Sequence, residues 1–373
     1  MDDKALRAAL EQMLERRDLS EVQAAAVLTA LTSEVPPALA GGLLAALRAK
    51  GVVADELRGF ARAMRSLARR PAIDAALSAR AIDIVGTGGD ASGSVNISTG
   101  TALLVAACGV PVIKHGNRSV SSRSGSADVL EQLGLPLPLD DLQAGECLDR
   151  CGFTFLFAPY YHPAMKAIAP VRQALGIRTI FNVLGPLTNP AAPAYQLTGA
   201  YSEPVAALMA DALAHMPGLK RAFVVHAANG WDEPTTVCDF TLFDVGSGQV
   251  RRSVRRPEEY GLRRCSAEEL AGGDATVNAA ALRAVLRGEH RGGHRDALLL
   301  GASLALECTG IAADPVAGVR FEGIEEPLAR LAGNAYAMDA ARLVTLGIKI
   351  QVDGGARGAW LQEQIDKAYY SMR

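Results

Sequence analysis

Residues Asp83 to Gly134 read DIVGTGGDASGSVNISTGTALLVAACGVPVIKHGNRSVSSRSGSADVLEQLG, and this stretch decides the fold. It alternates short apolar runs with glycine-rich or polar turns and with longer apolar segments. The pattern predicts two strands, each followed by a turn and a helix, at residues 82–85, 99–108, 110–113 and 127–133. Buried strands separated by helices are typical of a mostly parallel sheet covered by helices. In such sheets ligands bind beyond the carboxyl ends of the strands.

The same alternation continues with predicted strands at residues 153–157 and 222–226 and a helix at 203–215. The first eighty residues carry only helical patterns, and residues 160–187 indicate helix and loop. We therefore expect an α/β protein in two parts. A small helical subdomain, residues 1–80 joined by helices from about 160–190, is expected to hinge on a larger domain, residues 81–373, with a mostly parallel sheet flanked by helices.

The composition excludes several classes of protein. The 373 residues are 49% hydrophobic with a formal net charge of −2, which gives no reason to expect nucleic acid or an anionic membrane as a partner. No run approaches the roughly 20 apolar residues of a membrane span, and the chain start lacks an apolar signal core. The six cysteines are scattered without a Cys-x-x-Cys motif, which favours free thiols in a reducing cytoplasm.

The first turn carries the residues of an anion cradle. Glycines let the backbone approach a ligand closely, and amide groups at a helix start bind anions. The candidates for a diphosphate site are Gly86, Thr87, Gly88, Gly89, Asp90, Asn96, Ser98 and Thr99. A purely structural strand-to-helix turn remains open, and Ser98 or Thr99 could serve only as a helix N-cap.

The second turn, Lys114-His115-Gly116-Asn117-Arg118, places two cations, an imidazole and an amide after an apolar strand. This grouping has no obvious advantage for folding, so we expect it to contact the ligand, although a solvated loop is the alternative.

Two further groups of charged residues complete the pattern. Asp232 and Glu233 follow the strand at 222–226, and carboxylates at a strand end suit Mg²⁺ that bridges to phosphates, although acidic pairs on loops are usually just solvated. Arg172 and Arg178 are six residues apart. One of them can bind a planar carboxylate in a bidentate fork, and the other can pair structurally.

Taken together, the order and spacing of these motifs closely resemble anthranilate phosphoribosyltransferases. The resemblance rests on GTGGD, NIST, KHGNR, SSRSGSADVLE, HPAMK, VRQALGIRTIFN and LGPLTNP, and it runs to about residue 318. It implies the fold shared by class III phosphoribosyltransferases and nucleoside phosphorylases, usually as a homodimer through the helical subdomain. It also implies transfer of the phosphoribosyl group of phosphoribosyl pyrophosphate to the amine of anthranilate in tryptophan biosynthesis, with Mg²⁺.

The resemblance assigns roles to matching residues. Phosphoribosyl pyrophosphate would be held by the cradle residues named above together with Lys114 and Ser126. Anthranilate would contact Gly86, His115, Asn117 and Arg172, with Arg172 as the partner of its carboxylate. Mg²⁺ would be bound by Ser98, Asp232 and Glu233. No residue is expected to act as an acid or base, because an aromatic amine is already neutral at pH 7.

Several positions depart from the family pattern. The loop before the metal pair carries Ala227, Asn229 and the bulkier Trp231, and a late helix that usually carries asparagine has Gly301. Residues 51–53 replace the usual Gly-Glu-Thr, and the tail after Leu346 looks additional. These changes leave three alternatives open: a relative with another aromatic amine as acceptor, a pyrimidine-nucleoside phosphorylase, and a non-catalytic nucleic-acid-binding relative.

Overall fold

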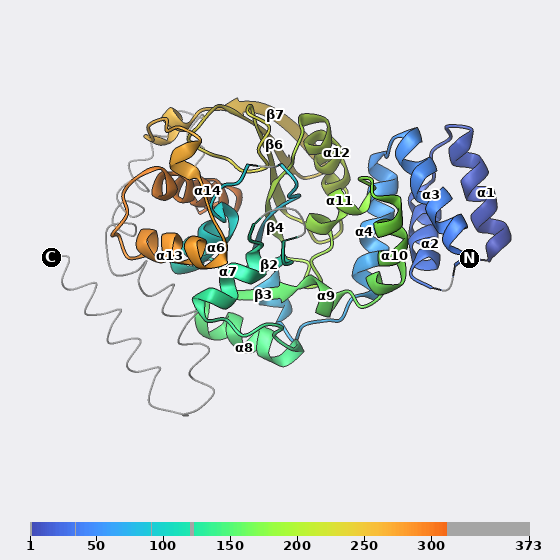
Figure 1. The fold of residues 1–373 in the computed structure, drawn as a ribbon, viewed down its shortest axis with the longest axis horizontal. Coiled ribbons are helices and arrows are strands. Elements are labelled where there is room, and N and C mark those ends of the chain that lie inside the picture. The colour runs from blue at the N-terminus through green and yellow to red at the C-terminus, as the bar shows by residue number, and fades with distance from the viewer. Residues whose placement is uncertain (1, 34, 91, 120–122, 312–373) are drawn as a thin grey trace.

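The computed structural model describes residues 2–33, 35–90, 92–119 and 123–311. A bundle of helices lies beside a seven-stranded sheet that carries helices on its faces (Figure 1). Residues 312–373 lie outside the described part, and with them the tail after Leu346. No helix within the described part is long and apolar enough to cross a membrane.

The helical bundle forms where the sequence predicts it. Its helices are α1 (Asp3–Leu14), α2 (Glu21–Leu31), α3 (Pro37–Lys50) and α4 (Ala54–Leu67). Ser20 caps α2 by accepting a hydrogen bond from the Gln23 amide, which stabilises a helix start. The short α5 (Ala75–Ser78) leads to the sheet. From the middle of the chain, α10 (Met165–Leu175) packs against α3, and α11 (Phe181–Leu184) packs against α4.

The sheet has the strand order β3-β2-β1-β4-β5-β6-β7. Its first five members are parallel, and β5, β6 and β7 are antiparallel neighbours, so the mostly parallel sheet expected from the sequence is confirmed. The strands are β1 (Ile82–Gly86), β2 (Val112–Gly116), β3 (Phe153–Phe157), β4 (Tyr195–Gly199), β5 (Arg221–Ala227), β6 (Phe240–Gly246) and β7 (Gln249–Arg255).

Helices cover both faces of the sheet. They are α6 (Ile97–Ala107), α7 (Ser126–Leu133), α8 (Asp141–Cys151), α9 (Ala158–Tyr161), α12 (Glu203–Ala214), α13 (Ala275–Leu286) and α14 (Gly293–Cys308), with short 3-10 turns at Gly185–Leu187, Pro257–Tyr260 and Glu268–Leu270. Along β5, Phe223 and Val225 belong to the core beneath α6 and α14, whereas Ala222 and Val224 belong to the core shared with α12 and the bundle. Alternate residues of one strand therefore hold two hydrophobic cores.

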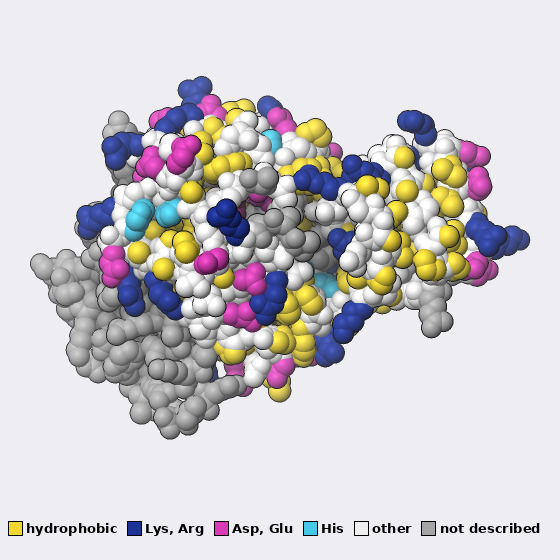
Figure 2. All heavy atoms as spheres, viewed as in Figure 1, with side chains coloured by type: hydrophobic (Ala, Val, Ile, Leu, Met, Phe, Trp, Pro, Cys, Tyr) yellow, Lys and Arg dark blue, Asp and Glu magenta, His cyan; other side chains and the backbone are white. Residues whose placement is uncertain are grey.

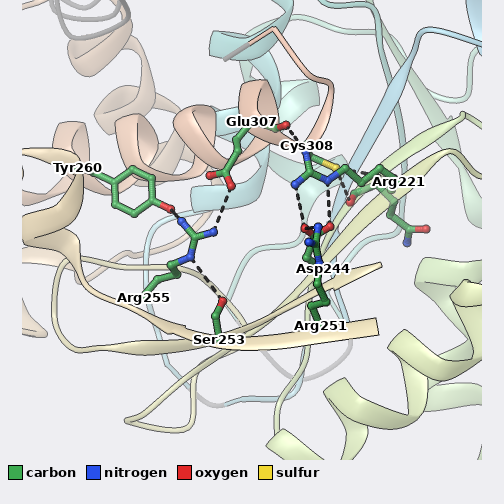
Figure 3. Close-up of polar contacts among 9 residues, drawn as sticks. Arg221, Asp244, Arg251, Ser253, Arg255, Tyr260, Glu307 and Cys308 are labelled. Atoms are coloured by element: carbon green, nitrogen blue, oxygen red, sulfur yellow. Dashed lines mark hydrogen bonds and ion pairs between the residues drawn. The ribbon is translucent and has the colours of Figure 1, made fainter. Parts of the chain in front are cut away.

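Paired charges tie α14 to the antiparallel edge of the sheet (Figure 3). Arg221, the first residue of β5, forms two hydrogen bonds of 2.9 Å with the Asp244 carboxylate and a third with the Glu307 carbonyl. Close by, the buried Arg255 guanidinium contacts Glu307 at 3.2 Å and the Tyr260 hydroxyl at 3.3 Å. Each carboxylate in this cluster has an arginine partner.

Candidate active site

The parallel strands β1, β2, β4 and β5 bring the predicted residues to one edge of the sheet, and the Asp232 carboxylate lies at its centre. A Cβ atom on Gly86 would lie 2.5 Å from Asp232 Oδ2, and one on Gly199 would overlap the Asp232 backbone. Both glycines therefore serve the close approach of the Asp232 loop to the strand ends. This gives Gly86 a structural reason to be glycine besides the predicted ligand contact.

Asp232 and Glu233 join the two motifs of the sequence. Asp232 Oδ2 accepts a hydrogen bond of 2.5 Å from the Gly88 amide and one of 3.4 Å from the Thr87 hydroxyl. Glu233 Oε1 accepts from the Ser98 amide at 3.2 Å, and Asp90 Oδ2 accepts from the Asp232 amide at 3.3 Å. The glycine turn, the start of α6 and the metal pair thus form one network. Asp232 is only 5% exposed, so the alternative that it is merely a solvated loop residue is wrong.

These carboxylates are only partly compensated, because one buried cation, Lys114, is shared by Asp83, Asp232 and Glu233. Burial, aided by the nearby Asp90, raises the pKa of Asp232, and burial together with Asp232 raises the pKa of Glu233. Within the described residues, no three His, Cys, Asp or Glu side chains form a protein-only metal cage. Mg²⁺ usually takes one or two carboxylates and completes its shell with water and phosphate. The donor set therefore fits a magnesium diphosphate better than a tightly held structural ion.

Lys114 and His115 lie inside β2, because the strand extends to Gly116 rather than ending at residue 113 as expected. Both are buried, at 2% and 3% exposure, so the solvated-loop alternative is wrong for them. Lys114 Nζ donates to the Ile84 carbonyl and to Ser98 Oγ. Burial lowers the pKa of Lys114, although the negative charges of Asp83, Glu233 and Asp232 act to raise it. Its ammonium group faces the carboxylates from beneath the α6 start.

His115 is neutral at pH 7, since burial, with the nearby His162, holds its pKa well below the ordinary value. Its Nδ1 lies 3.3 Å from the Gly185 carbonyl, which can only accept, so Nδ1 carries the proton. Nε2 is then an acceptor, and it has no hydrogen-bond partner among the described residues.

Arg118 differs from expectation. Its guanidinium binds Glu131 at 2.6 Å and Asp128 at 2.9 Å on α7, and these hydrogen bonds raise its pKa. It is therefore a structural partner of α7, and the second turn supplies one cation to the site instead of two. The neighbouring Asn117 is exposed, and its carbonyl oxygen accepts from the Ser126 hydroxyl at 3.3 Å. Asn117 and Ser126 are thus brought together, and their contact with a ligand stays a prediction.

At the start of α6, Asn96 and Thr99 have local roles. The Asn96 side chain donates to the Ser124 carbonyl and accepts from Asn278 Nδ2 at 2.8 Å, which fixes α6 relative to α13. The Thr99 side chain is buried, and its hydroxyl has no partner among the described residues. Predicted ligand contacts of these two residues remain predictions, while the Ser98 hydroxyl lies beside Lys114.

Arg172 is a half-buried cation without an anion. Its guanidinium lies 4.9 Å from the Phe181 ring centroid, and burial lowers its pKa. No carboxylate within the described residues pairs with it. Phe181 begins α11, which leads directly to Gly185, the partner of His115. The structure therefore brings Arg172 and His115 to the two ends of one short helix.

Sequence reasoning missed two residues near the site and left the role of a third open. Asp83, in β1, accepts from the His115 amide at 3.2 Å and from Asn189 Nδ2 at 2.9 Å, and burial raises its pKa to about 6. An acid inside an apolar strand was the signal for it. His162 packs edge-on against His115, with ring centroids 5.0 Å apart, and Arg178 donates to the Gly89 carbonyl. Both belong to quoted motifs. His162 had been given no place in the site, and Arg178 had been left as either a carboxylate-binding or a structural arginine.

Two departures from the family pattern have clear positions. Trp231 is 9% exposed and belongs to the main core of the α/β part, so its bulk serves packing. Gly301 lies on α14 against α6, where a Cβ atom would lie 2.6 Å from Thr101 Oγ1.

Comparison with known proteins agrees with this geometry. The glycosyl transferase family helical bundle domain matches residues 7–68, and the glycosyl transferase family a/b domain matches residues 78–328. The anthranilate phosphoribosyltransferase of Trichlorobacter lovleyi is 45% identical over 326 residues, which cover 84% of this chain and 93% of the relative. The crystal structure of the Thermus thermophilus enzyme is 40% identical with a TM-score of 0.81, over 91% of this chain and 99% of the other.

A more distant structure has the same fold. It is anthranilate phosphoribosyltransferase from Saccharomyces cerevisiae in complex with PRPP and Mg, 22% identical with a TM-score of 0.81, over 93% of this chain and 99% of that one. The family models span both parts of the molecule, and the bacterial relatives match over most of their length. The chain therefore belongs to the anthranilate phosphoribosyltransferase family.

Proposed function

We propose that this protein transfers the phosphoribosyl group of phosphoribosyl pyrophosphate to the amine of anthranilate, giving N-(5-phosphoribosyl)anthranilate and pyrophosphate in tryptophan biosynthesis. The proposal rests on one observation, which is an imbalance between positive and negative side chains in the two halves of the site. At the sheet edge the single buried cation Lys114 is shared by several buried carboxylates, whose pKa values stay raised, and the half-buried Arg172 lacks an anion in the described structure. A magnesium diphosphate and an aromatic carboxylate are the ligands that would correct both.

The donor half of the site binds the diphosphate. The glycine turn and the α6 start would line the phosphates, with the Gly88 and Ser98 amides holding Asp232 and Glu233 in this structure, and Lys114 adds a positive charge. Mg²⁺ held by Ser98, Asp232 and Glu233 would neutralise charge on the departing pyrophosphate. We assign to this half Gly86, Thr87, Gly88, Gly89, Asp90, Asn96, Ser98, Thr99, Lys114 and Ser126.

The acceptor half orients anthranilate. Arg172 offers a bidentate fork to the carboxylate, and Gly86 and Asn117 are assigned to the same half. The neutral His115 presents Nε2 as an acceptor, which suits an N–H of the attacking amine. Because the amine is uncharged at pH 7, positioning rather than deprotonation accounts for most of the rate.

The test follows the loss of anthranilate fluorescence with phosphoribosyl pyrophosphate and Mg²⁺. Consumption is expected only when both are present. Arg172→Ala should raise the KM for anthranilate by about 100-fold, the equivalent of one buried charged contact, and the KM for the diphosphate little. Arg172→Lys keeps the charge but not the bidentate geometry, so its KM for anthranilate should lie between those of the wild type and Arg172→Ala. Phosphorolysis of thymidine or uridine, or salt-sensitive binding of nucleic acid without turnover, would overturn the proposal.

We further propose a division into a helical subdomain, residues 1–80 with helices from about 160–190, and an α/β domain from residue 81. A homodimer through the helical subdomain is supported by the exposed Val22, at 79%, and Leu14, at 60%. Hydrophobic side chains are visible on the surface of the helical bundle (Figure 2). Light scattering of Val22→Glu should report a shift to monomers. The six free cysteines support a cytoplasmic location.

A further inference from the structure

Arg178 lies between α10 and α11, where three distant segments meet. Its Nη2 donates a hydrogen bond of 2.7 Å to the Gly89 carbonyl, and its guanidinium lies 4.3 Å from the Tyr201 ring centroid. Its own carbonyl accepts a 2.6 Å hydrogen bond from Arg48 of α3. Its side chain thus faces the glycine turn, while its backbone faces the helical bundle. No carboxylate in the described part of the chain neutralises it.

The hydrogen bond from Arg178 to the Gly89 carbonyl fixes the orientation of the Gly89–Asp90 peptide, which the glycines alone do not fix. Gly88 and Gly89 have φ values of +68° and +73°, in the left-handed region. Glycine adopts positive and negative φ about equally readily, so its own preference does not fix this conformation. In a trans peptide the carbonyl and the next amide point in opposite directions. Holding the Gly89 carbonyl toward Arg178 therefore directs the Asp90 amide to the other side of the turn. Among the described residues, that amide has no acceptor.

Tyr201 provides a platform that is fixed to the same turn. The Tyr201 amide donates to Thr87 Oγ1 at 3.2 Å, and the Thr87 amide donates to the Gly199 carbonyl at 3.0 Å. A cation over an aromatic ring is attracted to its face. The guanidinium is thereby held against the turn from two sides, which restrains a side chain that is otherwise exposed.

We propose that Arg178 is a positioning residue for the diphosphate. Its guanidinium orients the Gly89–Asp90 peptide so that the Asp90 amide is presented to phosphate oxygens, and it adds a positive charge at the edge of the cradle. This inference rests on the proposed function, which puts the diphosphate at the glycine turn. The competing role is a simple tie between the helical bundle and the α/β part, in which only the backbone contact with Arg48 matters.

Two variants separate these roles. Arg178→Ala removes the guanidinium but keeps its backbone carbonyl, whereas Arg48→Ala removes the tie to the bundle and leaves the guanidinium in place. Binding of inorganic pyrophosphate with Mg²⁺ is measured by calorimetry, and KM values for both substrates are measured by the fluorescence assay. Arg178→Ala should weaken pyrophosphate binding and raise the diphosphate KM about 10-fold, with the anthranilate KM within about twofold. Arg48→Ala should change neither by more than about twofold.

Conservative variants sharpen the result. Arg178→Lys keeps one donor and the charge and should recover part of the affinity, and Tyr201→Phe should behave as the wild type because the ring remains. Equal pyrophosphate affinity in Arg178→Ala and the wild type, or equal losses in Arg178→Ala and Arg48→Ala, would overturn the positioning role. If the wild-type protein binds neither pyrophosphate nor phosphoribosyl pyrophosphate, the proposed function itself is wrong and the inference falls with it.

Discussion

The two ends of strand β5 carry buried charge in opposite ways. At its start, Arg221 pairs with Asp244 through two hydrogen bonds (Figure 3). Burial alone would raise the pKa of Asp244, but the hydrogen bonds and the charge of Arg221 outweigh burial and lower it. Beyond its end, Asp232 and Glu233 lie next to each other, and burial raises both of their pKa values. In one cluster each carboxylate has an arginine partner, whereas in the other a single lysine, Lys114, is shared by Asp83, Asp232 and Glu233.

The difference separates structural charge from functional charge. A buried carboxylate without a partner costs free energy, so folding alone gives no reason to keep one. The balanced cluster lies at the amino end of β5, where it joins the sheet to α14. The unbalanced one lies at the carboxyl end of the parallel strands, where ligands bind in such sheets. The pKa shifts of the two clusters therefore have opposite signs.

Removing the unbalanced carboxylates should have the largest effect on activity. In Asp232→Asn with Glu233→Gln, the amide oxygens can still accept from the Gly88 and Ser98 amides. The metal contact is lost, so turnover should fall about 10³-fold, the equivalent of several kcal/mol. Steady-state kinetics across a range of Mg²⁺ concentrations measures this. Activity near that of the wild type at limiting Mg²⁺ would refute the metal assignment.

Breaking the balanced cluster should instead reduce stability. Arg221→Ala leaves Asp244 partly buried without its main partner, which should cost about 2 kcal/mol of unfolding free energy. Turnover per folded molecule should stay unchanged. Arg251 contacts the same carboxylate at 3.1 Å but is 78% exposed, so Arg251→Ala is the matched control and should unfold like the wild type. Urea denaturation compares the three proteins, and equal losses in both variants would contradict the role of burial.

The two clusters should respond to pH with opposite sign. Raised folded-state pKa values at Asp232 and Glu233 mean that the metal-free protein loses stability as the pH rises above about 4, the unfolded value, and through the raised values. The lowered pKa of Asp244 means that its contribution is present above about pH 4 and is lost as the pH falls. Denaturation in the presence of a chelator measures how the unfolding free energy changes between pH 5 and pH 8. Its decrease over this range should be smaller in the amide double variant than in the wild type by roughly 1 kcal/mol. An unchanged slope would contradict the shifts.

The fold was predictable where local pattern and burial agree. Glycine turns and apolar runs predicted β1, β3 and β5 within a residue or two. Strands β4, β6 and β7 were not predicted, and β7 gives little signal because its sequence, QVRRSVR, is largely exposed and alternates poorly. Strand β2 was predicted too short, because Lys114 and His115 read as polar turn residues although the sheet buries them.

The candidate site was predictable in membership but not in geometry. Sequence motifs named Asp232 and Arg172, yet nothing local shows that Asp232 is buried or that Arg118 pairs with α7. Those outcomes depend on contacts between segments far apart in the chain, such as Arg118 with Glu131 and Asp232 with Gly88. The assignment of these residues to ligands stays a prediction.

The close packing of α6 against α14 links the residues that are possible at positions 101 and 301. A Cβ atom at position 301 would lie 2.6 Å from Thr101 Oγ1 and 2.9 Å from its methyl group, so a side chain cannot enter there while Thr101 keeps its place. A larger side chain at position 301 is therefore compatible with this chain only if Thr101 shifts or is replaced by a smaller residue. We expect substitutions at positions 101 and 301 to have strongly non-additive effects on stability.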